Sequence, residues 1–75
     1  MNRYLVRTSD GILKFQIKEI TAMEIIGAGV GKWHTANYKD GTVVQQFILN
    51  IDFTADNNST RLYFWKGDKI DVMRN

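Results

Sequence analysis

The sequence predicts a mainly β protein, a small antiparallel barrel or curled sheet of roughly five or six strands in the size class of SH3-like and OB-like domains. Two observations indicate this class. Short runs with a two-residue apolar period recur along the chain, and glycine- or asparagine-containing turn sequences separate them. The sequence also contains no proline and no long helical period. A chain of 75 residues is expected to form one domain, residues 1–75, with a modest core.

The first hairpin is predicted from residues 3–8 and 12–18, which alternate on either side of an Asp-Gly pair. A two-residue loop collects the apolar residues on one face, whereas a slip by one residue would mix charged and apolar positions. The expected cross-strand pairs are Tyr4 with Ile17, Val6 with Phe15, Arg7 with Lys14 and Arg3 with Lys18.

Apolar and polar residues do not alternate cleanly over residues 19–27, so this segment is compatible with either a helix or a strand. Thr21 with Glu24 fits a capping box, and Ile20 with Ile25 fits the accompanying hydrophobic staple, which predicts a short helix near residues 21–28. The segment is short and rich in isoleucine, which suits a strand equally.

Residues 42–55 form the longest segment with a two-residue period, and we expect them to be the central strand. The preceding strand, residues 32–38, joins it through a second Asp-Gly sequence. A type I turn with Gly41 in a bulge places Trp33 opposite Phe47 and buries both rings. A two-residue loop would instead put Trp33 on the other face.

The last two strands are predicted over residues 60–66 and 69–73, after a turn at residues 56–59. In a hairpin between them, Tyr63 and Trp65 fall on the face of Ile70 and Val72. Leu62 and Phe64 then share the opposite face with Met73. Both faces are apolar, so one is exposed unless a second layer covers it.

Composition argues against an enzyme. The chain has no cysteine and one histidine, so neither a disulfide nor a zinc site is expected, and we predict no cofactor. The glycine-rich residues 27–32 lack the first glycine of a phosphate loop and the Ser or Thr that follows Gly-Lys. His34 has no acidic partner that the sequence identifies.

Targeting signals are also missing from the pattern. Since no apolar run reaches membrane-spanning length and the N-terminus lacks the apolar core of a signal peptide, we expect a cytoplasmic protein without membrane contact.

The basic face of the first hairpin is the first candidate site. Facing like charges, Arg7 with Lys14 and Arg3 with Lys18, would cost about 0.2 to 1 kcal/mol a pair. An external anion such as a nucleic-acid phosphate would relieve this repulsion. The alternatives are that the charges protect a sheet edge, or that acids on a neighbouring strand neutralise them. Those acids are Glu19, Glu24, Asp52 and Asp71.

The aromatic run at residues 61–66 is the second candidate site, and its candidates are Arg61, Tyr63 and Trp65. Three consecutive aromatic residues cannot all point to one side of a strand, so at least one is expected on the surface. Aromatic rings beside cations are typical of single-stranded nucleic-acid binders. The alternatives are completion of the core and a protein-binding surface.

These features favour a small non-enzymatic binding module that contacts nucleic acid. The residues expected to bind are Arg3, Arg7, Lys14, Lys18, Arg61, Tyr63 and Trp65. The alternative is a protein-binding module: a compact inhibitor or adaptor of a larger protein, or a homo-oligomer joined through an edge strand or the aromatic face.

Overall fold

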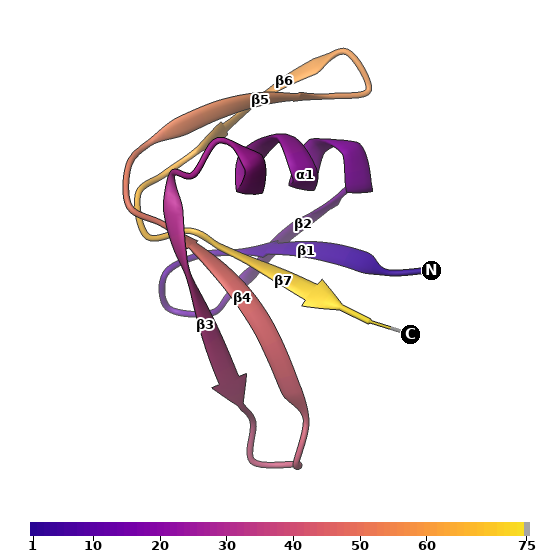
Figure 1. Cartoon of the computed structure of the whole chain (residues 1–75), viewed down its shortest axis with the longest axis vertical. Helices are drawn as coiled ribbons and strands as arrows, with labels where there is room; N and C mark the ends of the chain where they lie inside the picture. Colours follow the sequence, from indigo (N-terminus) through magenta and orange to yellow (C-terminus); the bar gives the residue numbers. More distant parts are fainter. Residues whose placement is uncertain (75) are drawn as a thin grey trace.

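The computed structural model describes residues 1–74 and contains, within them, seven strands and one helix (Figure 1). In chain order the elements are β1 (Arg3–Arg7), β2 (Leu13–Ile17), α1 (Glu19–Gly27), β3 (Gly31–Asn37), β4 (Val43–Leu49), β5 (Phe53–Asn57), β6 (Thr60–Phe64) and β7 (Lys69–Met73).

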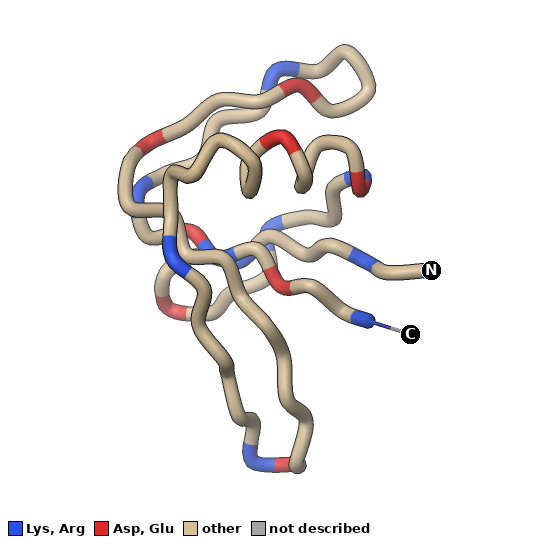
Figure 2. Tube along the Cα trace, in the orientation of Figure 1, with Lys and Arg blue, Asp and Glu red and all other residues tan. Residues whose placement is uncertain are grey.

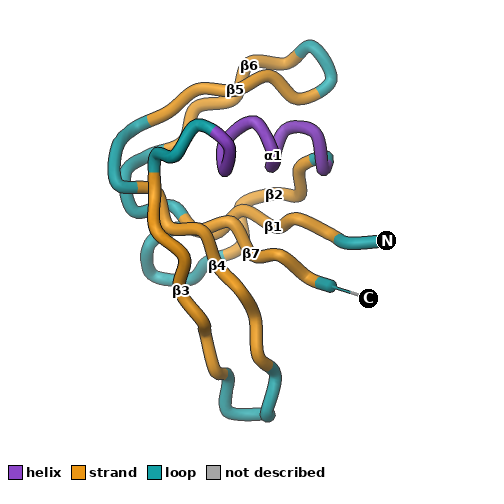
Figure 3. Tube along the Cα trace, viewed as in Figure 1, coloured by secondary structure: helices purple, strands orange, loops and turns teal. Residues whose placement is uncertain are grey.

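Five strands form one antiparallel sheet in the order β2-β1-β7-β4-β3, while β5 and β6 pair with each other in a separate two-stranded sheet. Helix α1 lies between the large sheet and the β5–β6 hairpin (Figures 1 and 3). The mainly β class is therefore confirmed. A closed barrel is not formed by residues 1–74. It would require the edge strands β2 and β3 to pair or to be bridged by another strand, but the chain leaves the sheet after β4, and β5 and β6 pair only with each other.

The core fills the space between the sheet, α1 and the hairpin. Phe64 of β6 is fully buried and meets the edge of Phe15 of β2, with ring centroids 6.1 Å apart. The buried apolar side chains are Tyr4, Val6, Ile17, Ala22, Ile25, Phe47, Leu49, Ala55, Phe64, Ile70 and Val72. The inner faces of the sheet and the hairpin thus face each other, so their outer faces point in opposite directions.

Residues 19–27 form a helix, as one of the two predictions had it, but the predicted capping box does not form its N-terminus. The helix starts after Lys18, whose side chain makes no cap hydrogen bond within the described residues. Thr21 is buried inside the first turn, and its hydroxyl donates to the Asp56 carbonyl (3.0 Å) and the Asn57 side chain (2.8 Å). Ile20 is exposed, so the predicted staple with Ile25 is also wrong.

The first hairpin has the predicted apolar pairs, Tyr4 with Ile17 and Val6 with Phe15, although its loop and its register near the loop differ from the prediction. Its loop is longer than two residues: the Gly11 amide donates to the Thr8 carbonyl, and Gly11 has φ +92°. A β-bulge then shifts the register, which places Arg7 opposite Leu13. The predicted pairing of Arg7 with Lys14 is wrong because Lys14 is the extra residue of this bulge.

The predicted central strand, residues 42–55, is two strands in two sheets. Residues 50–52 interrupt it, because the Asp52 carboxylate accepts hydrogen bonds from the Tyr63 hydroxyl and the Lys66 amide and turns the chain into the hairpin. The alternation predicted for β4 is also incomplete. Val43 is exposed, and Val44 and Gln46 are buried on the face away from α1.

The turn between β3 and β4 is the predicted one. The Gly41 amide donates to the Tyr38 carbonyl, Gly41 has φ +91°, and Trp33 pairs with Phe47. Their rings are in edge contact, with centroids 5.3 Å apart. Trp33 itself is 52% exposed, so its predicted burial is wrong: α1 covers the β1 side of the sheet and leaves the β3 side open.

The predicted pairing of the last two strands does not occur in the described chain. β7 enters the large sheet between β1 and β4, while β6 stays with β5. Tyr63 and Trp65 therefore do not share a face with Ile70 and Val72. Those two residues are buried, while both aromatic rings are exposed.

Candidate functional site

Arg7 is neutralised inside the protein. Its Nε donates to the Asp71 carboxylate at 2.7 Å, and its Nη1 donates to the Gly11 carbonyl at 3.0 Å. Asp71 is 1% exposed and also accepts a 2.7 Å hydrogen bond from Gln46. The acid named as a neutralising partner in the sequence analysis is therefore present, and Arg7 is committed to the fold.

Lys14 is committed in the same way. Its ammonium lies 3.0 Å from the Asp68 carboxylate, which is buried and also accepts the Trp65 backbone amide. Asp68 was not among the acids that the sequence suggested. It lies in the turn before β7, and only the folded chain brings it to the β2 strand.

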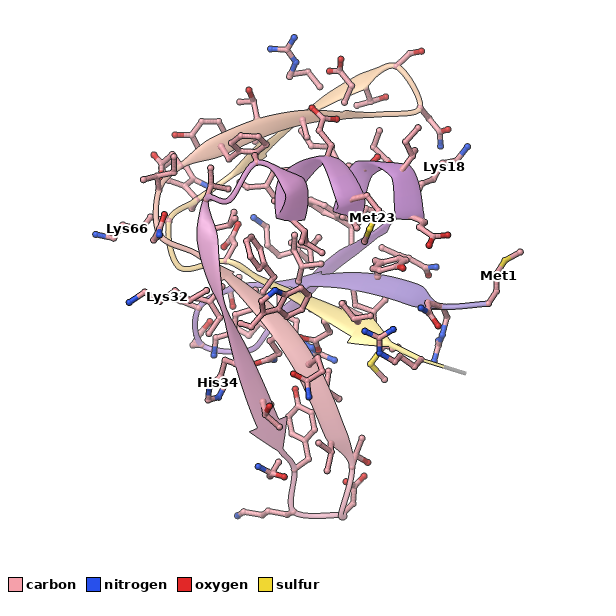
Figure 4. The ribbon with its side chains drawn as sticks, in the orientation of Figure 1. Met1, Lys18, Met23, Lys32, His34 and Lys66 are labelled. Carbon is pink, nitrogen blue, oxygen red and sulfur yellow. The ribbon has the colours of Figure 1, made fainter. Side chains whose placement is uncertain are left out.

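The other two predicted cations lie at the end of this hairpin that is opposite its loop. Arg3 is exposed at the start of β1, and Lys18 is exposed where α1 begins (Figure 4). Acidic residues lie close to basic ones around the first hairpin and in the β5–β6 hairpin (Figure 2). The like-charge pair of Arg7 with Lys14 is therefore absent from the described register, whereas the pairing of Tyr4 with Ile17 leaves Arg3 and Lys18 at the next positions along the two strands.

The second candidate site is brought together by the fold. Arg61, Tyr63 and Trp65 alternate along β6 and the residue that follows it, so they lie on its solvent side, opposite buried Phe64. Tyr63 is 47% exposed and Trp65 is 59% exposed. Their rings are in edge contact, with centroids 4.8 Å apart and planes at 74°. We call this surface, with Asp52, which accepts a hydrogen bond from Tyr63, the aromatic face.

Hydrogen bonds hold the aromatic face in place. The Asp52 carboxylate accepts the Tyr63 hydroxyl at 2.6 Å and the Lys66 amide at 2.7 Å. The hydrogen bond from Tyr63 lowers the pKa of Asp52, with the Lys66 amide as a second cause, and the same bond to Asp52 raises the pKa of Tyr63. The backbone on both sides of Trp65 is thus fixed, since Trp65 itself donates to Asp68.

Charges at the edge of the aromatic face are balanced. Arg61 pairs with Asp56 across the hairpin, at 2.9 Å between the guanidinium and the carboxylate. The positive charge of Lys66 acts on the Asp52 carboxylate and helps to lower the pKa of Asp52. The surface therefore has an aromatic centre and a rim of mixed charge.

A hollow that the sequence analysis did not identify lies between β3, β4 and the turn after β6. Lys32, His34 and Lys66 line it, together with apolar side chains that include Ile48. The side chains of Lys32, His34 and Lys66 project to the same side of the molecule (Figure 4). Among the described residues, no carboxylate lines this hollow. Sequence reasoning missed it because Lys66 is remote from β3 along the chain.

Three further properties describe residues 1–74. Within residues 1–74, no group of three or more His, Asp or Glu side chains is placed to hold a metal ion. The same residues contain no helix with the length and apolar character needed to cross a membrane. Every buried side-chain nitrogen or oxygen in this part has a hydrogen-bond partner.

Comparison with known proteins assigns no relative: no protein-family model, no curated protein and no solved structure matches the chain significantly.

Proposed function

We propose that this protein is a non-enzymatic module that binds a protein partner through its aromatic face. The observation that carries the proposal is the exposed, hydrogen-bonded pair of Tyr63 and Trp65 at the centre of that surface. Tyrosine, tryptophan and arginine are the residues that most often dominate the free energy of protein–protein binding.

Preorganisation supports this choice. Because Asp52 and Asp68 fix the backbone around Trp65, binding would order few additional groups, and ordering side chains at an interface costs about 0.5 to 1.5 kcal/mol each. The surface also matches the anatomy of a binding site, with a central aromatic patch and a charged rim.

Charge favours a protein over a nucleic acid on this face. Asp52 bonds to Tyr63 and Asp56 lies at the edge of this face, so both carboxylates would repel phosphates, while Arg61 is paired with Asp56. The edge contact between Tyr63 and Trp65 also covers part of the ring surface on which bases would stack. The two predicted cations Arg7 and Lys14 do not assist, because they lie on the large sheet and are paired there with Asp71 of β7 and with Asp68 in the turn before β7.

Site-specific photo-crosslinking tests the proposal. A photoreactive residue at Thr54, which pairs with Tyr63 on the aromatic face, should capture a protein in cells. The same residue at Thr42, in the distant β3–β4 turn, is the control and should not capture it.

The captured protein would then be purified and titrated with the double variant Tyr63→Ala and Trp65→Ala. Loss of two hot-spot residues is expected to weaken binding by at least one order of magnitude, since each hot spot is worth about 2 kcal/mol or more. Equal binding by the double variant would exclude the aromatic face.

Nucleic-acid binding is a second candidate, on a different surface. It is favoured by the hollow between β3, β4 and the turn after β6, which Lys32, His34 and Lys66 line and to which no carboxylate of the described residues contributes. A single strand bound there should be released by salt. The variant Lys32→Ala with Lys66→Ala should reduce the log-log salt slope by about 0.7 for each lost phosphate contact. A parent protein without affinity for a mixed pool of oligonucleotides at low salt would exclude this candidate.

A further inference from the structure

Strand β3 is a long open edge of the large sheet. It is the last strand in the order β2-β1-β7-β4-β3, and all seven of its residues pair with β4 in an unbroken register. Most of its residues are exposed, and the β3–β4 hairpin extends beyond the rest of the fold (Figure 1). The opposite edge, β2, carries the bulge at Lys14, a feature that discourages further pairing.

The register shows which backbone groups of β3 are open. The Tyr38 amide donates to the Thr42 carbonyl, and the Asn50 amide donates to the Val30 carbonyl. Since the direction of the hydrogen bonds alternates along an antiparallel strand, the even-numbered residues of β3 bond to β4. The odd-numbered residues direct their amides and carbonyls outward, where residues 1–74 offer no neighbouring strand. They are Gly31, Trp33, Thr35 and Asn37.

We propose that two copies of this chain associate by antiparallel pairing of their β3 strands, with His34 on the two-fold axis. In this register Gly31 bonds to Asn37 of the second copy and Trp33 bonds to Thr35 of the second copy. Each of these residues is one of those that point outward. Any other two-fold register leaves part of β3 without a partner, so this one forms the most hydrogen bonds.

The side chains are compatible with self-pairing. Lys32 lies opposite Ala36 of the second copy, so the two lysines are kept apart. Trp33 lies opposite Thr35 of the second copy, and aromatic residues beside β-branched ones are favourable cross-strand pairs. Trp33, which is 52% exposed in the isolated chain, would gain cover. The two five-stranded sheets would become continuous.

This inference is independent of the proposed protein-binding function, while the hollow of the second candidate shares Lys32 and His34 with β3. The aromatic face lies on the β5–β6 hairpin, whereas β3 is an edge strand of the other sheet. The double variant Tyr63→Ala and Trp65→Ala should therefore dimerise like the parent, and failure of either idea leaves the other open to test.

Cysteine crosslinking tests the register directly, because the chain has no cysteine of its own. In the proposed dimer the two His34 residues form a non-hydrogen-bonded pair, with Cα atoms about 4.5 Å apart. His34→Cys should therefore form a disulfide-linked dimer under mild oxidation. Lys32→Cys is the matched control on the same face of β3, and it should remain largely unlinked because its counterpart lies several residues away along the strand.

A charge test at Ala36 complements crosslinking. Ala36→Glu places a carboxylate opposite Lys32 of the second copy and should tighten the dimer severalfold in sedimentation experiments. Ala36→Lys places like charges opposite each other and should weaken it by a similar factor. Circular dichroism of both variants checks that the monomer fold is kept.

Several results would overturn the proposal. One is a parent protein that stays monomeric by light scattering up to millimolar concentration. Another is a crosslinking pattern in which Lys32→Cys links as readily as His34→Cys. A third is equal association of the two Ala36 variants, and a fourth is an edge that pairs with an extended peptide but never with a second copy.

Discussion

The Nε atom of Arg7 lies 2.7 Å from the Asp71 carboxylate, and this contact joins the first strand to the last across 64 positions of the chain. It places a cation that the sequence assigned to ligand binding inside the hydrogen-bond network of the sheet. Asp71 has a second partner in Gln46, so three adjacent strands, β1, β7 and β4, share one buried carboxylate.

Arg7→Ala is therefore expected to destabilise the fold. It leaves the buried Asp71 carboxylate without its counter-charge, and breaking a buried pair typically costs 3 to 5 kcal/mol. We expect roughly 3 kcal/mol, the lower end of that range, because the Arg7 side chain keeps 26% exposure. Urea unfolding measures the loss.

Arg3→Ala is the matched control for Arg7→Ala. Arg3 is exposed on the same strand, and its substitution should change the free energy of unfolding by about 0.5 kcal/mol or less. Equal stabilities of the two variants would contradict a structural role for the Arg7–Asp71 pair.

The Tyr63–Asp52 hydrogen bond predicts a pH dependence in each direction. The pKa of Tyr63 is raised in the folded state, so this contribution is complete below the ordinary tyrosine pKa of about 10 and is lost as the pH rises through the folded-state value. The pKa of Asp52 is lowered, so its contribution is complete above about 3.9 and is lost as the pH falls through the folded-state value.

Ultraviolet titration can isolate the Tyr63 ionisation as the difference between the parent and Tyr63→Phe. Asp52→Ala should move that ionisation back towards the ordinary tyrosine pKa. An unchanged titration curve would show that the hydrogen bond is not formed in solution.

Gly31 and Gly27 should respond oppositely to alanine. A Cβ at Gly31 would lie 2.3 Å from the Ile48 carbonyl oxygen, a backbone atom that can retreat only if β3 and β4 separate. Gly31→Ala should cost about 1 to 3 kcal/mol, as overpacking typically does. A Cβ at Gly27 meets nothing within 4 Å, so Gly27→Ala, at the end of α1, should be neutral or stabilise by up to about 1 kcal/mol. Thermal unfolding of both variants is the measurement, and a stable Gly31→Ala would refute the close approach.

Thr21→Val should loosen α1 from the hairpin. The single O–H of Thr21 is shared between the Asp56 carbonyl and the Asn57 side-chain oxygen, and valine keeps the shape of threonine without the donor. Removing one partner of a buried hydrogen bond costs about 1 to 3 kcal/mol. Hydrogen exchange should speed up in α1 and β5 before it does in β7. Thr21→Ser keeps the hydroxyl and should retain most of the protection.

Much of the local structure could be predicted from the sequence, because turns depend on adjacent residues. The Asp-Gly sequences at residues 10–11 and 40–41 both form turns in which glycine has a positive φ, and the β3–β4 register follows from the second. Tyr4 and Val6 also meet their predicted partners, although the loop length was wrong. The apolar face determines that register, and the bulge at Lys14 absorbs the difference.

The tertiary structure alone decided which strands pair and which charges are free. Residues 50–52 continue the two-residue period, yet the chain turns there because Asp52 bonds to Tyr63 and Lys66, which lie 11 and 14 positions further on. Arg7 and Lys14 have the spacing of a basic face, but their acids, Asp71 and Asp68, lie 64 and 54 positions away. A periodic pattern records which side of a strand is apolar. It holds no information about a partner that only long-range pairing brings into contact.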